Sequence, residues 1–222
     1  MEDVYFSDLR REMVELIAAH SAMVRDHMDK DAIDDRVMAA MAKVPRQEFV
    51  PVELRRMAYL DNPLPIGFEK TISQPFIVAF MTDLLDLEPH HRVLEIGTGL
   101  GYQAAVLGEL AAVVYSVEII EELAGDARRR LDGQGYDNVE SKVGNGYYGW
   151  PEQAPFDAIM VTAAPDLIPP PLFGQLKPGG RMVIPAGIEK SQQLMMVRKE
   201  PEGHITTRDI LPVMFSSMVT VT

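Results

Sequence analysis

Gly97-Thr98-Gly99-Leu100-Gly101 decides the fold, because it joins an apolar strand to a helix. The apolar residues 93–96 precede this stretch, and a helix-compatible segment, residues 102–110, follows it. Glycine permits a tight turn and a close approach of the backbone to a ligand, while free N–H groups at a helix start attract an anion. Dinucleotide sites usually read G-x-G-x-x-G. The shorter G-x-G-x-G pattern, with Glu95 two positions before its first glycine, favours S-adenosylmethionine over NAD.

A second acidic residue supports a nucleoside site. Residues 113–117 read as the next parallel strand, and Glu118 ends it, 21 residues after Gly97. A carboxylate at the carboxyl end of this strand can accept both hydroxyls of a ribose. A lone glutamate at a strand end is commonly no more than a solvated residue. At this distance from a glycine turn, it predicts a ribose-binding residue instead.

The composition predicts one α/β domain with an appendage, and it excludes several classes of function. The 222 residues are 47% hydrophobic, which is enough for a full core. A net charge of −12 without a long Lys/Arg cluster argues against a nucleic-acid partner. No apolar run approaches the roughly 20 residues that span a bilayer, and the chain start lacks a basic region. We therefore expect no membrane partner and a cytoplasmic location.

Metal and disulfide chemistry are not expected either. The chain has no cysteine, and its five histidines show no metal-ligand spacing.

The hydrophobic pattern predicts an N-terminal helical segment followed by a regular α/β alternation. Helices are expected at residues 7–27, 34–43 and 77–85, with an irregular stretch at 45–70 that contains a short helix around 52–59. Central strands are expected at 92–96, 113–117, 138–143, 157–161 and 180–185, and helices at 102–110, 120–133 and 169–176. Two late neighbouring strands, 192–199 and 206–213, predict an antiparallel edge on an otherwise parallel sheet.

Over residues 30–215 the chain resembles the protein-L-isoaspartate (D-aspartate) O-methyltransferase family. The most distinctive match is the loop Thr71-Ile72-Ser73-Gln74-Pro75, which precedes the glycine motif. The glycine motif itself is shared by most class I methyltransferases. Further matches lie at residues 44–46, 49–51, 63–67, 93–99, 101–105, 115–118, 155–157 and 176–180.

The resemblance implies a fold and an activity. The fold is α/β, the Rossmann-like class I S-adenosylmethionine-dependent methyltransferase fold, with a seven-stranded, mostly parallel sheet and an antiparallel final strand pair. Residues 1–75 would form N-terminal helices and a substrate-side loop, and residues 76–222 the core of one compact domain. The activity is methyl transfer from S-adenosylmethionine to the α-carboxylate of L-isoaspartyl, and by extension D-aspartyl, residues in damaged proteins, which initiates repair. S-adenosylhomocysteine is the second product, and we expect a monomer that acts on isoaspartyl proteins and peptides.

The resemblance also implies residue roles. Ser73 would sit beside the transferred methyl group as the catalytic residue. Cofactor contacts are implied for Thr71, Ile72, Glu95, Gly97, Thr98, Gly99, Gly101, Glu118, Ile119, Asn145 and Gly146. Substrate contacts are implied for Ile72, Gln74 and Val213. Without the resemblance, Ser73 also reads as a turn or capping serine before a helix, and both roles can hold together.

The chain departs from the family pattern at several positions. Asn145 stands where the family usually has Asp, which removes a charge from an expected adenine contact, and Leu100 replaces a frequent Ser. Ser216-Ser217 replaces a Val-Pro pair in the segment that closes the active site. These changes leave two alternatives open: a carboxylate methyltransferase for one dedicated partner peptide, and an inactive cofactor-binding regulatory module.

The expected chemistry suits the residues of the loop. An α-carboxyl group has a pKa of about 3.5, so the nucleophile is ionised at neutral pH and needs no general base. The loop from Thr71 to Pro75 contains no His, Lys or carboxylate. Because the reactants carry opposite charges that diminish during transfer, alignment and exclusion of water should supply most of the acceleration.

Overall fold

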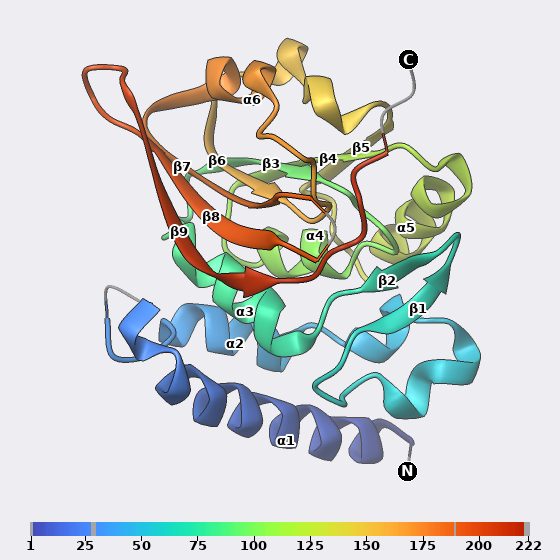
Figure 1. Ribbon diagram of the computed structural model, residues 1–222. Helices are drawn as coiled ribbons and strands as arrows, with labels where there is room; N and C mark the ends of the chain where they lie inside the picture. Colours follow the sequence, from blue (N-terminus) through green and yellow to red (C-terminus); the bar gives the residue numbers. More distant parts are fainter. Residues whose placement is uncertain (1, 28–29, 189, 220–222) are drawn as a thin grey trace.

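A seven-stranded sheet forms the centre of the computed structural model, which describes residues 2–27, 30–188 and 190–219 (Figure 1). In order across the sheet, the strands are β5 (Val139–Val143), β4 (Val113–Glu118), β3 (Arg92–Ile96), β6 (Phe156–Val161), β7 (Leu176–Ala186), β8 (Gln192–Lys199) and β9 (Ile205–Val213). The first five are parallel, while β8 and β9 pair antiparallel. The predicted α/β class, the mostly parallel sheet and its antiparallel edge are confirmed.

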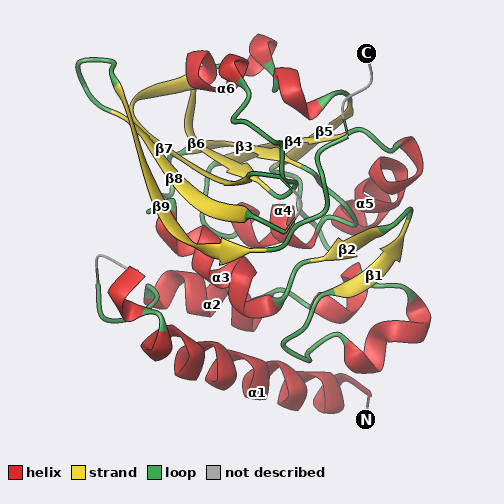
Figure 2. Ribbon diagram, viewed as in Figure 1, coloured by secondary structure: helices red, strands yellow, loops and turns green. Residues whose placement is uncertain are grey.

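Helices cover both faces of this sheet, which explains why its central strands are apolar on both sides. One face packs against α3 (Pro75–Leu84), α4 (Tyr102–Gly108) and α5 (Glu121–Gly133), and α6 (Pro170–Gln175) lies on the other (Figure 2). In β3, Val93 belongs to the first buried cluster, whereas Leu94 and Ile96 belong to the second. Short 3-10 turns complete the chain at Arg25–His27, Arg46–Phe49, Val52–Met57, Gly146–Tyr148 and Pro151–Gln153.

The N-terminal helices form a further layer below α3. Helices α1 (Glu2–Met23) and α2 (Asp35–Lys43) pack together and against α3 (Figure 1). Phe6, Met13 and Ile17 of α1 are buried in the same apolar cluster as residues of the central sheet. One core therefore extends from the first helix to the last strand.

The stretch 45–70, which the sequence predicts to be irregular, ends in a β-hairpin instead. Strand β1 (Leu64–Gly67) pairs antiparallel with β2 (Lys70–Ile72). The connecting residues, Phe68 and Glu69, have φ values of 52° and 57°. Positive φ at both central residues is the geometry of a type I′ turn, which Asn-Gly normally occupies. The two turn residues are neither Asn nor Gly, and Pro65 lies within the first strand, so the usual sequence signal is missing.

Most other predicted elements are confirmed, with differences at their ends. The first helix begins at Glu2 and ends at Met23, so it lies earlier than the predicted range of 7–27. Strand β7 begins at Leu176, so it starts earlier than the predicted strand 180–185 and follows directly after α6. Gly179 has a φ of 82° there, and the register with β6 shifts, so the extension is an irregular strand start. Within the described ranges, no helix is long and apolar enough to cross a membrane.

Candidate active site

The main pocket lies where the strand order of the sheet reverses. From β3 the chain continues on one side to β4 and β5, and on the other side to β6 and β7. This reversal opens a crevice at the carboxyl ends of the strands, the usual ligand position in open α/β sheets. The pocket has a volume of about 370 Å³. Its walls come from the ends of β3, β4 and β6, the β1–β2 hairpin, the start of α3 and the tail after β9.

The glycine turn lines this pocket through Gly97 and Gly99, where a side chain is poorly accommodated. Gly97 has a φ of 95°, and an added Cβ would lie 2.4 Å from Thr162 Oγ1. Gly99 has a φ of 55°, and its Cβ would lie 3.2 Å from Ile66 Cδ1 on the hairpin. Gly97 therefore needs glycine on two grounds, backbone conformation and space, and Gly99 on the ground of backbone conformation. The exposed backbone can then approach a ligand directly.

Glu118 lines the pocket at the end of β4 and holds the glycine turn in place. Its Oε2 accepts a hydrogen bond from the Gly99 N–H at 2.8 Å. Its Oε1 accepts from the N–H groups of Ile119 and Ile120, at 2.9 and 3.0 Å. A carboxylate has about four lone-pair positions, so Glu118 keeps acceptor capacity on Oε2 for a hydroxyl in the pocket.

The side chains of Glu95 and Thr98 are buried and do not line the pocket. The Glu95 side chain is fully buried, and its Oε2 accepts a hydrogen bond from Ser116. Thr98 Oγ1 lies 2.5 Å from Ser116 Oγ and extends this chain of hydroxyls. Burial raises the pKa of Glu95 to about 8, because a charged carboxylate loses its hydration there. Among the described residues, Glu95 Oε1 has no hydrogen-bond partner.

Gly146 brings a second backbone segment to the pocket wall. An added Cβ would lie 2.3 Å from Ile96 Cγ2, so only glycine allows the chain to lie this close to the end of β3. The neighbouring Asn145 does not line the pocket. Its Oδ1 accepts a hydrogen bond from the Tyr147 N–H at 3.0 Å and caps the 3-10 turn that begins at Gly146.

Ser73 lines the same pocket as the glycine turn, and Arg46 fixes its backbone. Arg46 is fully buried; its Nη2 donates to Ser73 O and its Nε to Ala58 O, both at 2.7 Å. The guanidinium lies 4.7 Å from the ring centroid of Tyr102, a cation–π distance. Burial lowers the pKa of Arg46 below its ordinary value. A buried cation is thus used to hold one carbonyl of the loop.

Asp61 holds the other end of the same loop. Its Oδ2 accepts from Gln74 Nε2 at 2.9 Å, and its Oδ1 accepts from the Phe76 N–H at 2.8 Å. Phe76 is in the first turn of α3, where a carboxylate favourably satisfies a free N–H. His20 Nδ1 lies 2.8 Å from Asp61 Oδ2, which connects this carboxylate to α1. Arg46 and Asp61 together fix the chain from the Ser73 carbonyl to Phe76.

The tail after β9 forms the remaining wall and is attached to the loop after β6. The Ala164 N–H donates to Ser216 O at 2.9 Å, and the Met218 N–H donates to Ala164 O at 2.8 Å. The side chain of Gln192 pairs with the backbone N–H and carbonyl of Phe215, at 2.6 and 3.1 Å. The two serines that replace the family's Val-Pro pair therefore lie in a segment with defined backbone contacts.

Nine of the residues predicted for the site line the pocket together: Thr71, Ser73, Gln74, Gly97, Gly99, Glu118, Ile119, Gly146 and Val213. Five predicted residues do not line it: Ile72, Glu95, Thr98, Gly101 and Asn145. The Ile72 side chain is buried in the core. Gly101 begins α4 with a φ of 94°, and its Cβ would lie 3.1 Å from Leu131 Cγ, so it serves helix packing.

Several pocket residues are missed by the sequence reasoning. Thr162 follows β6 directly, and its hydroxyl donates to Gly97 O at 2.7 Å. The rule that ligands bind at the carboxyl ends of parallel strands could have identified it. Lys70 and Ile66 depend on the hairpin, which the sequence does not predict. Leu123 and Ile77 carry no local signal that separates them from core residues.

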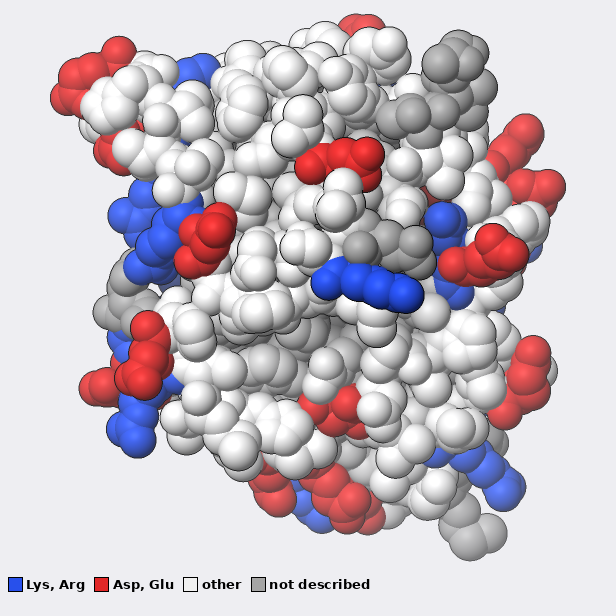
Figure 3. Space-filling model, in the orientation of Figure 1, with Lys and Arg blue, Asp and Glu red and all other residues white. Residues whose placement is uncertain are grey.

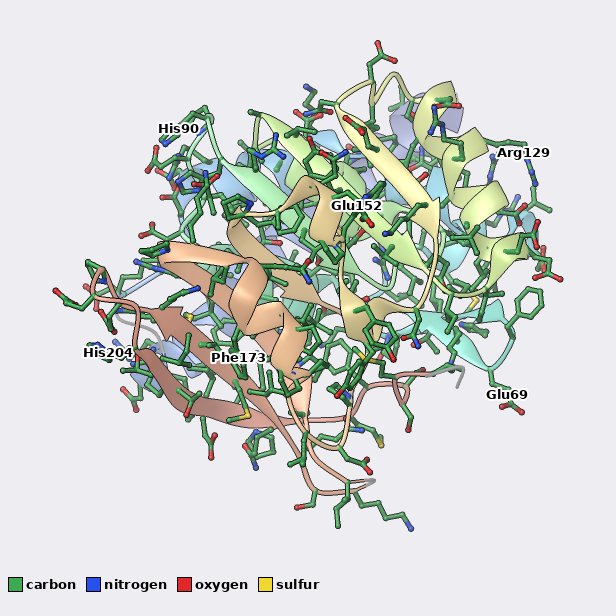
Figure 4. The ribbon with its side chains drawn as sticks, turned by 90° about the horizontal axis from the view of Figure 1, so that it is seen from above. Glu69, His90, Arg129, Glu152, Phe173 and His204 are labelled. Atoms are coloured by element: carbon green, nitrogen blue, oxygen red, sulfur yellow. The ribbon has the colours of Figure 1, made fainter. Side chains whose placement is uncertain are left out.

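The pocket is nearly free of titratable groups. Among its described lining residues, Lys70 and Glu118 are the only charged side chains, and none is a histidine. In Figure 4, His90 and His204 lie far from Glu69, which marks the tip of the hairpin. No group of three or more His, Cys, Asp or Glu residues in the described part of the chain could hold a metal ion. The pocket offers an anionic acceptor for hydroxyls, a serine hydroxyl and exposed backbone.

Comparison with known proteins identifies relatives over almost the whole chain. The family model described as protein-L-isoaspartate(D-aspartate) O-methyltransferase matches residues 18–222. Protein-L-isoaspartate O-methyltransferase 1 of Polaromonas sp. strain JS666 is 63% identical over 216 residues, covering 97% of this chain and 92% of that protein. A protein of the same name from Cupriavidus necator is 56% identical, covering 95% and 82%.

Solved structures show the same fold. A protein-L-isoaspartate O-methyltransferase matches with a TM-score of 0.81 and 29% identity, covering 95% of this chain; this chain spans 66% of its length. A structure from Plasmodium falciparum, named for the same activity and solved with S-adenosyl-L-homocysteine, matches with a TM-score of 0.77. The match covers 95% of this chain and 98% of the Plasmodium falciparum chain at 23% identity. At this identity the similarity is evidence for the fold alone.

Proposed function

The chain belongs to the protein-L-isoaspartate(D-aspartate) O-methyltransferase family, and from that premise we propose how its own residues perform the reaction. The protein is a protein-L-isoaspartate O-methyltransferase of the class I fold. It uses S-adenosylmethionine to methylate isoaspartyl residues of damaged proteins and so acts in protein repair.

We propose that the glycine turn and Glu118 bind the nucleoside part of the cofactor. The fit rests on three observations: no Cβ is tolerated at Gly97, the Glu118 carboxylate keeps acceptor capacity for a ribose hydroxyl, and Gly146 brings bare backbone to the wall. Ile119 and Thr71 line the same pocket and would contact the cofactor directly. Glu95, Thr98 and Gly101 would not contact the cofactor and would instead stabilise the glycine turn and the start of α4. Asn145 would position Gly146 through its cap.

Ser73 is the proposed residue that aligns the substrate carboxylate. Bound S-adenosylmethionine supplies an electrophilic methyl group, so an ionised carboxylate can react without loss of a proton. The Ser73 hydroxyl makes no hydrogen bond to another described residue, so it is available as a donor to one carboxylate oxygen. Its backbone is fixed by Arg46 and Asp61, which limits the directions in which the hydroxyl can point. This fixed donor is how the chain would orient the nucleophile.

Gln74 and Val213 are the proposed substrate contacts on either side of Ser73. Both line the pocket, and the Gln74 amide is held by Asp61, which leaves its carbonyl free to accept from a substrate N–H. Ile72 would contribute through its backbone, since its side chain is in the core. The hairpin and the tail would exclude water once a peptide lies between them.

The single observation that carries this proposal is that Ser73 and the glycine turn line one pocket. The test is incorporation of labelled methyl groups into matched peptides that contain L-isoAsp, L-Asp or D-Asp at one position. We expect transfer to the L-isoAsp peptide and none to the L-Asp peptide. Preference for the L-Asp peptide would instead indicate a dedicated partner, and the D-Asp peptide decides whether D-aspartyl sites are accepted.

We propose that residues 1–75 and 76–222 act as one compact domain, since α1 and the sheet share one buried cluster. We propose a monomer, because the pocket needs no residue from a second copy. We also propose a cytoplasmic location. Light scattering during gel filtration tests the oligomeric state, and fractionation of cells tests the location.

A further inference from the structure

Lys70 is the one basic residue among the described residues that line the pocket. It is half-buried at the start of β2 and lies beside the reaction loop, three positions before Ser73. It faces the pocket, whereas its neighbour Glu69 lies at the exposed hairpin tip and does not line it (Figure 4). Of the two charged lining residues, Glu118 belongs to the proposed cofactor half. Lys70 is the other charged lining residue, on the strand that leads into the reaction loop.

No acidic side chain in the described part of the chain neutralises Lys70. Asp and Glu residues outnumber Lys and Arg by 33 to 21, and many lysines and arginines form ion pairs, but no such pair includes Lys70. In Figure 3 the middle of this face carries few charged side chains, most of which lie toward its edges. A half-buried, unpaired cation in a pocket is suited to an anionic group that arrives with the substrate.

The carboxylate that receives the methyl group is a poor partner for this cation. Its negative charge disappears during transfer, so a cation paired with it would stabilise the reactant more than the transition state. An acidic side chain elsewhere on the substrate keeps its charge throughout. Pairing with such a group would strengthen binding of reactant and transition state equally, and so would raise kcat/KM through KM.

We propose that Lys70 is a specificity-determining residue that binds an acidic side chain close to the isoaspartyl residue of the substrate. This inference rests on the proposed function of the pocket. It adds a preference among isoaspartyl sites, favouring those with a neighbouring Asp or Glu. Lys70 is held on a short hairpin, so the preference is confined to one or two positions along the peptide.

The test is a double-mutant cycle on kcat/KM with C-terminally amidated isoaspartyl peptides. In one series a single Glu is moved from two positions before the isoaspartyl residue to two positions after it, and in the matched series Gln replaces that Glu. We expect the wild type to favour Glu over Gln about two- to fivefold at the best position, the range of a partly exposed ion pair. Lys70→Gln should abolish this preference, Lys70→Glu should reverse it, and salt should weaken it.

The matched control is Glu69→Gln, which changes the net charge by one at a neighbouring residue outside the pocket. We expect it to leave the position dependence unchanged. Equal effects of Lys70→Gln on Glu and Gln peptides at every position would overturn the proposal, as would an effect of Glu69→Gln of the same size. Methylation of the neutral isoaspartyl peptide by the wild type tests the proposed function separately, because that reaction does not involve a flanking charge.

Discussion

The role of Glu118 gives the most quantitative prediction about cofactor binding. Glu118→Ala removes the carboxylate that accepts from Gly99, Ile119 and Ile120 and that keeps acceptor capacity toward the pocket. With three of about four lone-pair positions occupied, the cofactor gains about one charge-assisted hydrogen bond from this residue. Such a bond contributes about 1.5–3 kcal/mol, so the dissociation constant should rise about 10- to 150-fold.

Glu118→Gln should also weaken binding, although it keeps the size of the side chain. An amide offers one oxygen, so its NH₂ group must face either Gly99 N–H or the N–H groups of Ile119 and Ile120. One donor then meets another donor. We expect the loss for Gln to approach the loss for Ala, which a purely steric role of Glu118 would not produce.

Calorimetry with S-adenosylmethionine and S-adenosylhomocysteine measures both losses. Because the two ligands share the ribose, each substitution should weaken them by the same factor. Glu122→Ala, on the exposed side of α5, is the matched control for a change of one charge. Unchanged affinity in Glu118→Ala would refute the assignment of the ribose to this carboxylate. An equal loss in Glu122→Ala would show that the effect is one of net charge.

Three further predictions concern residues around the pocket. Since the pKa of Glu95 is raised from 4.5 to about 8, the folded state keeps this carboxyl protonated up to about pH 8, whereas the unfolded state loses the proton near pH 4.5. The contribution of this group to stability is therefore complete below pH 4.5 and is lost as the pH rises to about 8. In denaturant titrations, the unfolding free energy of the wild type relative to Glu95→Gln should fall over this range by up to about 1.4 kcal/mol per pH unit. Asn145→Asp should leave cofactor affinity equal or slightly higher in calorimetry, because a carboxylate can cap Tyr147 as the amide does; a large loss would mean that the adenine pocket depends on the amide. Replacing Ser216 by Val together with Ser217 by Pro should lower the KM for peptide in steady-state assays and leave cofactor affinity unchanged, because proline reduces the conformational freedom of the unbound tail. Proline fits at position 217 because neither backbone hydrogen bond to Ala164 uses the Ser217 N–H. A loss of peptide activity would show that the serines themselves contact the substrate.

The sequence predicts the central part of the fold well, and the reason is local. Strand β3 and the start of α4 coincide with the predicted ranges, because an apolar run, a glycine turn and a helix start adjoin each other along the chain. The predicted residues at the ends of β3 and β4 meet in one pocket because parallel strands end at the same edge of a sheet. These features follow from short-range pattern alone.

The parts that were not predicted depend on contacts between distant segments. The hairpin turn at Phe68 and Glu69 adopts positive φ without the usual residues, so its geometry is imposed by the surrounding structure. Arg46 carries no local signal of burial, yet it is fully buried and holds Ser73, 27 residues further along. Asp61 likewise meets Gln74 and His20 only in three dimensions. Such roles cannot be obtained from spacing along one chain.

The most direct test of the proposed mechanism is the rate of the chemical step in Ser73→Ala, measured by quench-flow in a single turnover with cofactor and isoaspartyl peptide saturating. Because Arg46 holds the Ser73 carbonyl and not its hydroxyl, the substitution removes the proposed donor and leaves the backbone contact in place. Loss of the alignment of the carboxylate predicts a rate lower by up to about 100-fold, the cost of a misplacement of about 1 Å, with unchanged cofactor affinity. Ser217→Ala, which removes the hydroxyl of another lining serine, in the tail after β9, should retain the wild-type rate. A wild-type rate in Ser73→Ala would contradict the assignment of carboxylate alignment to this serine.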